Sequence, residues 1–225
     1  MVAPQLTYVL IAAGGMGSRM QTTTPKQYLL IHGKPLLYYT VTQFVAALPS
    51  VHIVLIVPSN YVTATELLIN TYFSTIPISV VVGGNTRYQS VANGMAIVPL
   101  TAQVVMVHDA ARCMVSTTLI TNCYQHTIAY GNAVPCVPVV DSLRKITTNN
   151  SEVLNRDTIR AVQTPQCFTA LVLHKAMQQP YLPSFTDEAT AVQQLGYDIQ
   201  LISGDAHNIK ITTPLDIQIA TLLLA

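Results

Sequence analysis

Charged side chains are scarce in this sequence. Asp, Glu, Lys and Arg make up only 9% of the 225 residues, whereas an average soluble protein has roughly 25%. The formal net charge of +1 gives no reason to expect a nucleic acid or an acidic membrane surface as a partner. Because charge is rare, its position is informative. Six of the eleven lysines and arginines fall in loop-like segments beside expected strand ends: Arg19, Lys26, Arg87, Arg112, Arg156 and Lys210.

Long apolar runs and paired cysteines are also missing. No uninterrupted run approaches the roughly 18 residues that span a bilayer, and no basic segment precedes an apolar core near residue 1. We therefore expect a cytoplasmic protein without a membrane segment. The cysteines show no CxxC spacing, which favours buried free thiols over a zinc site or disulfides. They are Cys113, Cys123, Cys136 and Cys167. At this length we expect one domain that spans residues 1–225.

Short apolar strands alternate with helical patterns along most of the chain. The expected strands cover residues 9–11, 52–57, 78–82, 104–107, 133–140 and 199–202. This alternation predicts an α/β fold, a single-domain, Rossmann-like, doubly wound and mostly parallel sheet. In such sheets ligands bind outside the carboxyl ends of the strands. The loops that follow the first, third and fourth strands should therefore converge on one face.

Residues 141–163 break the alternation. Two extended segments, residues 142–147 and 158–163, flank the turn-prone Asn149-Asn150-Ser151, which predicts a β-hairpin arm. A hairpin with few core residues is expected to leave the globular body and pack on another subunit. An edge hairpin on the same sheet is the alternative.

The first strand ends in small residues. They are Ala12, Ala13, Gly14 and Gly15, and they would let a large ligand lie against main-chain N–H groups, which suit phosphate oxygens. Close strand–helix packing is the alternative use of such a turn. The P-loop spacing is absent, and Met20 occupies the third glycine position of the dinucleotide fingerprint, which argues against a nicotinamide oxidoreductase.

Asp109 directly follows an apolar strand and should face the glycine loop. Its carboxylate could hold Mg²⁺ against phosphate oxygens, although a helix cap or an ion pair would explain it equally well. Nucleotidyl transfer requires mainly alignment and positive charge. Arg19, Lys26 and Lys210, with a metal at Asp109, would supply that charge. We interpret His108 as a packed histidine and not as a base.

Eight segments of the chain occur in the order of one known family. They are Ala12–Met20, Pro25–Tyr28, Gly83–Arg87, His108–Arg112, Asn155–Arg156, Thr164–Gln166, Thr186–Glu188 and Asn208–Thr212. This ordered set spans nearly the whole chain and resembles the 2-C-methyl-D-erythritol 4-phosphate cytidylyltransferases of non-mevalonate isoprenoid synthesis. The resemblance implies CTP as donor, the polyol phosphate 2-C-methyl-D-erythritol 4-phosphate as acceptor of CMP, Mg²⁺ as cofactor and pyrophosphate as leaving group.

The resemblance also implies roles for individual positions. The catalytic residues would be Arg19, Lys26, Arg156 and Lys210. Main chain at Ala12, Ala13, Gly14 and Gly15 would bind the nucleotide, with Gly84 and Ser90 near the cytosine. Asp109, Arg112 and Thr164 would bind the substrate, and Asp109 would also serve the metal. In this family the hairpin reaches across a homodimer, so Arg156 would act in the neighbouring subunit's site.

Two positions depart from the family pattern. The family often has Pro-Ala-Ala-Gly where this chain begins its loop with Ala12-Ala13, and it usually has proline where this chain has Cys113. The first departure resembles the related ribitol 5-phosphate cytidylyltransferases, so ribitol 5-phosphate is the alternative acceptor. A nucleotide-binding module without catalysis is the alternative of another class.

Overall fold

A mixed eight-stranded sheet forms the centre of the molecule. The computed structural model describes residues 6–15, 24–48 and 50–224. The strands of the sheet are β1 (Thr7–Ala12), β4 (Val51–Val57), β5 (Ile78–Val82), β6 (Val104–Asp109), β7 (Asn132–Pro138), β10 (Arg160–Val162), β11 (Gln166–Thr169) and β12 (Leu201–Ser203). Their spatial order is β10-β7-β11-β6-β1-β4-β5, and β12 pairs with β7.

The core of the sheet is parallel, as predicted. Strand β1 pairs in parallel with both β4 and β6, and β4 pairs in parallel with β5. Val9, Leu10 and Ile11 are fully buried. This agrees with their sequence, since a strand that is covered on both faces is typically an uninterrupted apolar run. The prediction missed β11, which lies antiparallel between β6 and β7. The sheet is therefore mixed around a parallel core.

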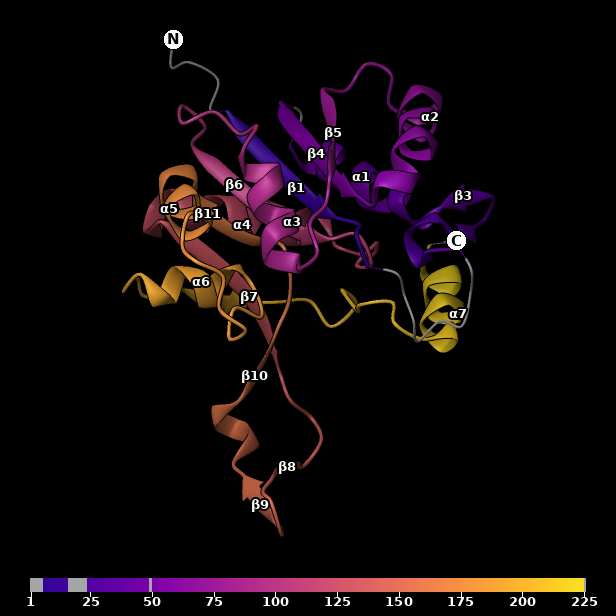
Figure 1. Ribbon diagram of the computed structural model, residues 1–225. Helices are drawn as coiled ribbons and strands as arrows, with labels where there is room; N and C mark the ends of the chain where they lie inside the picture. Colours follow the sequence, from indigo (N-terminus) through magenta and orange to yellow (C-terminus); the bar gives the residue numbers. More distant parts are fainter. Residues whose placement is uncertain (1–5, 16–23, 49, 225) are drawn as a thin grey trace.

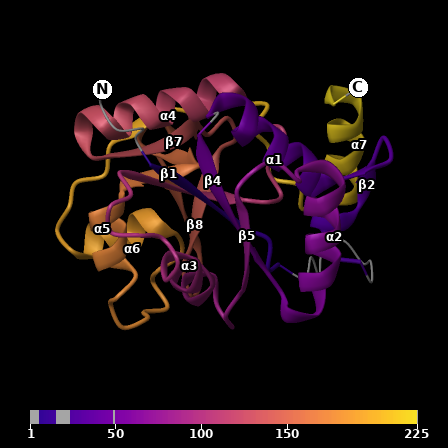
Figure 2. The same ribbon diagram turned by 90° about the horizontal axis from the view of Figure 1, so that it is seen from above.

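Helices cover both faces of the sheet, as Figure 2 shows. The helices are α1 (Leu36–Ala47), α2 (Val62–Tyr72), α3 (Arg87–Met95), α4 (Thr117–Tyr130), α5 (Ala170–Ala176), α6 (Glu188–Gln194) and α7 (Pro214–Leu223). On the first face Phe44 of α1 lies in one core cluster with residues of α2 and α4. On the other face Phe168 packs with residues of α3, α5 and α6. None of the described helices combines the length and hydrophobicity that a bilayer span requires.

Helix α7 begins with a capping box formed by Thr213 and Asp216. The Thr213 side chain accepts a hydrogen bond from the Asp216 backbone, the Asp216 side chain accepts one in return, and Pro214 occupies the first turn. This reciprocal arrangement satisfies main-chain donors that the start of a helix leaves unpaired. It also places the preceding segment, residues 208–212, beside the carboxyl end of β6, where Ile211 N donates to Ala111 O at 2.9 Å.

The hairpin arm projects from the body, as Figure 1 shows. It consists of β8 (Leu143–Ile146) and β9 (Ser151–Leu154), which pair antiparallel, and of a short 3-10 helix, η4 (Arg156–Thr158). The arm was predicted, but its second strand was not. Residues 160–162 were expected to pair within the hairpin and instead pair with β7 as β10. Two further short strands, β2 (Leu30–Ile31) and β3 (Lys34–Pro35), and the 3-10 helices η2 (Lys26–Tyr28) and η3 (Ser59–Tyr61) complete the described elements.

Candidate nucleotide and acceptor site

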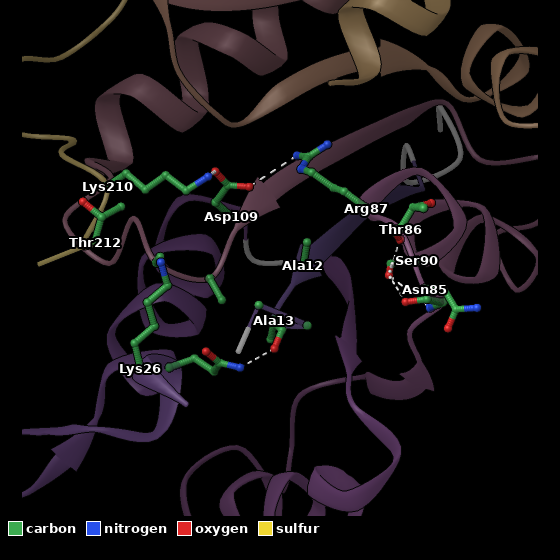
Figure 3. Close-up of a pocket in the computed structure, with 16 residues that line it drawn as sticks. Ala12, Ala13, Lys26, Asn85, Thr86, Arg87, Ser90, Asp109, Lys210 and Thr212 are labelled. Carbon is green, nitrogen blue, oxygen red and sulfur yellow. Dashed lines mark hydrogen bonds and ion pairs between the residues drawn. The ribbon is translucent and has the colours of Figure 1, made fainter. Parts of the chain in front are cut away.

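A cavity of about 460 Å³ lies at the carboxyl end of β1. The loops that follow β1, β5 and β6 meet there, as predicted, and residues of the segment before α7 close one side (Figure 3). Its lining comprises Ala12, Ala13, Gly14, Gly15, Lys26, Gln27, Gly84, Asn85, Thr86, Arg87, Ser90, Asp109, Ala110, Ala111, Lys210 and Thr212.

The exit of β1 presents an anchored main chain to the cavity. Ala13 N donates to Ile56 O at 2.8 Å, and the buried Gln27 side chain donates to Ala13 O. Gly14 and Gly15 are exposed. A Cβ added at Gly15 would meet nothing within 4 Å. The small residues therefore leave room for a ligand against fixed backbone, as expected for a phosphate-binding loop.

The loop after β5 is fixed by the start of α3. Thr86 caps this helix, and Ser90 Oγ donates to Thr86 O at 2.8 Å and accepts from Gly84 N at 3.0 Å. A Cβ at Gly84 would lie 2.5 Å from Gln89 Cβ, so only glycine fits there. The two predicted nucleotide contacts in this loop, Gly84 and Ser90, thus belong to one rigid turn beside the cavity.

Three cationic side chains surround the carboxylate of Asp109. Its Oδ2 lies 2.7 Å from Lys210 Nζ and 3.9 Å from Arg112 Nε, and its Oδ1 lies 3.3 Å from Arg87 Nη2. Burial by itself would raise the pKa of Asp109, but the charges of Arg87 and Lys210 hold that pKa well below its usual range. Asp109 is therefore ionised, and its carboxylate orients the three cationic side chains around it.

Arg87 is a site residue that the sequence reasoning did not select. Its guanidinium lies between Asp109 and Glu188, the first residue of α6. Glu188 is only 2% exposed; burial raises the pKa of this carboxyl, and the Arg87 charge opposes that rise. The sequence did contain an indication of this role, because Arg87 is one of few charged residues and follows the Gly83-Gly84 pair at the end of a strand. Glu188 lies 101 residues farther along, and nothing local indicated that it would meet Arg87.

Arg112 and Thr164 are not among the residues that line the cavity, but each of them contacts Asp109, which does. Thr164 Oγ1 accepts from Asp109 N at 3.0 Å. Arg112 Nη1 donates to Asn208 O at 2.6 Å. His108 is fully buried beside them, and burial lowers its pKa to about 4. The interpretation of His108 as a packed side chain is confirmed.

A scan against protein-family models matches residues 7–225 to the model described as 2-C-methyl-D-erythritol 4-phosphate cytidylyltransferase. The chain belongs to this family. It is 39% identical over 217 residues to the 2-C-methyl-D-erythritol 4-phosphate cytidylyltransferase of Phocaeicola vulgatus, with 96% of this chain and 99% of that protein covered. The sequence therefore identifies it as a cytidylyltransferase, and hence as a nucleotidyltransferase.

Solved structures agree with this assignment. The crystal structure of the Thermus thermophilus 2-C-methyl-D-erythritol 4-phosphate cytidylyltransferase superposes with a TM-score of 0.77 at 29% identity, covering 97% of this chain and 98% of that one. A 4-diphosphocytidyl-2C-methyl-D-erythritol synthase from Anaerococcus prevotii gives 0.83 at 21% identity, with 98% of each chain covered, which supports the fold alone. The α/β fold with a separate hairpin is thus that of the family.

Three of the predicted catalytic residues differ in how they relate to the cavity. Arg19 lies outside the described residues. Arg156 is exposed on the arm, where its guanidinium donates to Val140 O, and it does not line the cavity of its own chain. Lys26 does line the cavity, and its Nζ donates to Ile211 O at 2.7 Å.

The described residues offer a limited set of metal ligands. No group of three or more His, Cys, Asp and Glu side chains in this part of the chain could hold a metal ion. Asp109 is the single carboxylate among the described lining residues, and both its oxygens face cations. Mg²⁺ commonly takes one or two carboxylates together with substrate phosphates. The donor set therefore fits a cation whose ligands come mainly from a bound triphosphate.

Proposed function

We propose that the cavity at the carboxyl end of β1 is where this cytidylyltransferase carries out its reaction. The family transfers CMP from CTP to 2-C-methyl-D-erythritol 4-phosphate and releases pyrophosphate, in the synthesis of isoprenoid precursors. One observation carries the assignment of the site. The exposed main chain at Gly14 and Gly15 shares a single cavity with the cationic side chains of Lys26, Arg87 and Lys210.

The cytidine triphosphate binds along the loops after β1 and β5. Backbone N–H groups at Gly14 and Gly15 hold phosphate oxygens, beside the main chain of Ala12 and Ala13, and the Gly84–Ser90 turn contacts the cytosine. Lys26, Lys210 and Arg19 stabilise the charge that builds on the triphosphate as the α-phosphorus is attacked. Removing one such preorganised donor typically costs 10²–10³-fold in kcat.

The acceptor phosphate attacks the α-phosphorus of CTP. A new bond forms between an acceptor phosphate oxygen and that phosphorus, and the bond to the bridging oxygen of the β-phosphate breaks, so that pyrophosphate leaves with the electron pair. A phosphate monoester has a second pKa of about 6, so it is largely dianionic at neutral pH and needs no base. Asp109, Arg112 and Thr164 bind the acceptor.

A divalent cation, proposed to be Mg²⁺, accompanies the triphosphate. Cytidylyltransferases generally use such an ion, and when bound it supplies further positive charge to the phosphates. Direct ligation by Asp109 stays a prediction, because a metal ion there would share the carboxylate with the cationic side chains of Lys210 and Arg87. We propose that phosphate oxygens provide most of the ligands.

The arm is proposed to complete the site of a second copy of this one-domain chain. Exposed apolar side chains support this: within the arm Ile146 is 79% and Val153 72% exposed, and Val140, just before the arm, is 80% exposed. Covering them against another subunit would place Arg156 beyond the body of its own chain, where it can reach the neighbouring site.

The test is a pyrophosphate-release assay that crosses CTP, ATP and GTP with two acceptors. We expect release only with CTP, 2-C-methyl-D-erythritol 4-phosphate and a divalent cation together. Release with ribitol 5-phosphate alone would assign the acceptor that the Ala12-Ala13 loop start favours. CTP binding without release under any condition would identify a nucleotide-binding module instead.

A further inference from the structure

The imidazole of His108 connects two residues of the proposed acceptor site. His108 is the fifth residue of β6 and is completely buried. Its Nδ1 lies 3.0 Å from Thr164 Oγ1, and its Nε2 lies 3.1 Å from the main-chain oxygen of Arg112. The ring of Phe44 packs edge-on against it, with 4.9 Å between centroids.

The partners of the ring fix where its hydrogen lies. The Arg112 carbonyl oxygen can only accept, so His108 Nε2 must carry a hydrogen and donate it. Both ring nitrogens contact uncharged oxygens, and a buried imidazolium would need an anionic partner to offset its lost hydration. The ring is therefore neutral, and Nδ1 is an acceptor.

The hydroxyl of Thr164 must then donate its single hydrogen to His108 Nδ1. Thr164 Oγ1 also accepts the backbone N–H of Asp109 at 3.0 Å. The three groups form one directional chain, from Asp109 N–H through the Thr164 hydroxyl to the imidazole. A hydroxyl has one hydrogen and two lone pairs, so a single lone pair remains for a ligand.

We propose that His108 is a positioning residue that makes Thr164 a hydrogen-bond acceptor toward the substrate. An acceptor cannot pair with a phosphate oxygen that carries no hydrogen. Thr164 therefore meets a hydroxyl group of the acceptor's polyol chain, and the phosphate binds to the cations. The ring also links the Asp109 backbone to the Arg112 carbonyl, so one buried side chain sets the geometry of three proposed acceptor residues.

Two near-isosteric variants separate the two bonds of the ring. His108→Asn places an amide oxygen near the position of Nδ1 and can still accept from Thr164. His108→Gln places an amide nitrogen near the position of Nε2 and retains only the bond to Arg112 O. Both variants bury an amide in the same space, so thermal unfolding should change by similar amounts.

We expect His108→Gln to raise the KM for the acceptor about tenfold, the usual effect of one misdirected buried hydrogen bond, and to leave the KM for CTP within twofold. His108→Asn should stay within about threefold of wild type for both. In a Thr164→Val background, His108→Gln should add no further loss. Equal acceptor KM values for the two histidine variants, or a parallel change in the KM for CTP, would overturn the proposal.

This role of His108 rests on the function proposed above. A second measurement that does not depend on turnover therefore tests the role separately. Ring ¹⁵N NMR at pH 7, with the signal assigned by its loss in His108→Asn, should show the neutral Nε2–H tautomer. An Nδ1–H tautomer or an imidazolium would refute the positioning role even in an inactive protein. Absence of pyrophosphate release by the wild type with every acceptor would instead refute the proposed function and leave the NMR result to decide on His108.

Discussion

Neutralising Asp109 should weaken the fold and strengthen the attraction of the site for phosphate. Among the described residues that line the cavity, Lys26, Arg87 and Lys210 are cationic and Asp109 is the single anion. Their formal charge is +2, and Asp109→Asn raises it to +3 with almost no change in shape. The substitution removes the counter-charge of Lys210 and Arg112, whereas Arg87 keeps its ion pair with Glu188.

The size of the effect follows from burial. Removing one partner of a buried ion pair costs about 3–5 kcal/mol. The side chain of Asp109 is 12% exposed, but those of Arg87 and Lys210 are 29% and 42% exposed, so solvent screens part of the loss. We expect about 2 kcal/mol. In a chain of this length each kcal/mol shifts Tm by roughly 2–4 °C, which gives a drop of about 4–8 °C.

The loss should depend on pH with a defined sign. The pKa of Asp109 is depressed in the folded state, so its contribution to stability is fully present above the unfolded value of about 3.9. That contribution declines as the pH falls toward the folded value. The difference in Tm between wild type and Asp109→Asn should therefore be constant from pH 5 to 8 and smaller at pH 3.

Thermal unfolding with and without tripolyphosphate is the assay. The anion should stabilise Asp109→Asn more than wild type, because the site is more positive. The matched control is Asp198→Asn, at an exposed position, which should change stability by less than about 0.5 kcal/mol. Wild-type stability of the Asp109 variant at pH 7, or an unchanged difference at pH 3, would refute the electrostatic account of this cluster.

Three further outcomes can be measured. Lys210→Ala should lower kcat by about 10²–10³-fold in the pyrophosphate assay, and a change confined to KM would contradict its transition-state role. Lys26→Ala and Arg156→Ala proteins should each be inactive, and mixing them should restore some turnover if the arm serves a neighbouring subunit; no recovery after verified subunit exchange argues for separate sites. Gly84→Ala should lose about 1–3 kcal/mol from overpacking because its Cβ would lie 2.5 Å from Gln89 Cβ, whereas Gly15→Ala should unfold like wild type.

The parts of the site with local signals could be predicted from the sequence. The small residues after β1, the carboxylate at the end of β6 and the cap of α7 are each determined by a few neighbouring residues. Thr213, Pro214 and Asp216, for example, form a capping box whose atoms all lie within one turn. Ordered family motifs then indicated which of these local features share a site.

Features that depend on distant partners could not be predicted. Strand β11 has four residues, too few for a periodic pattern, and only its neighbours β6 and β7 determine its direction. Residues 160–162 resemble the second half of the hairpin, yet pairing with β7 places them in the main sheet. The Arg87–Glu188 ion pair likewise joins α3 to α6, and the sequence of neither helix specifies the other.

The two lysines proposed to bind the triphosphate are already bonded within the protein. Lys26 Nζ donates to Ile211 O, and Lys210 Nζ contacts Asp109 Oδ2, so both proposed triphosphate lysines already have partners on the segment before α7 or at the end of β6. A phosphate that binds either lysine must replace or share these bonds. The net gain is the difference between two charge-assisted hydrogen bonds and is smaller than either one alone. Ile211 N is also bonded to Ala111 O beside Asp109, so the segment that carries Lys210 keeps a second attachment when a triphosphate draws Lys26 away. A triphosphate can replace the bonds of both lysines at once, which favours binding of the whole triphosphate over binding of a single phosphate group.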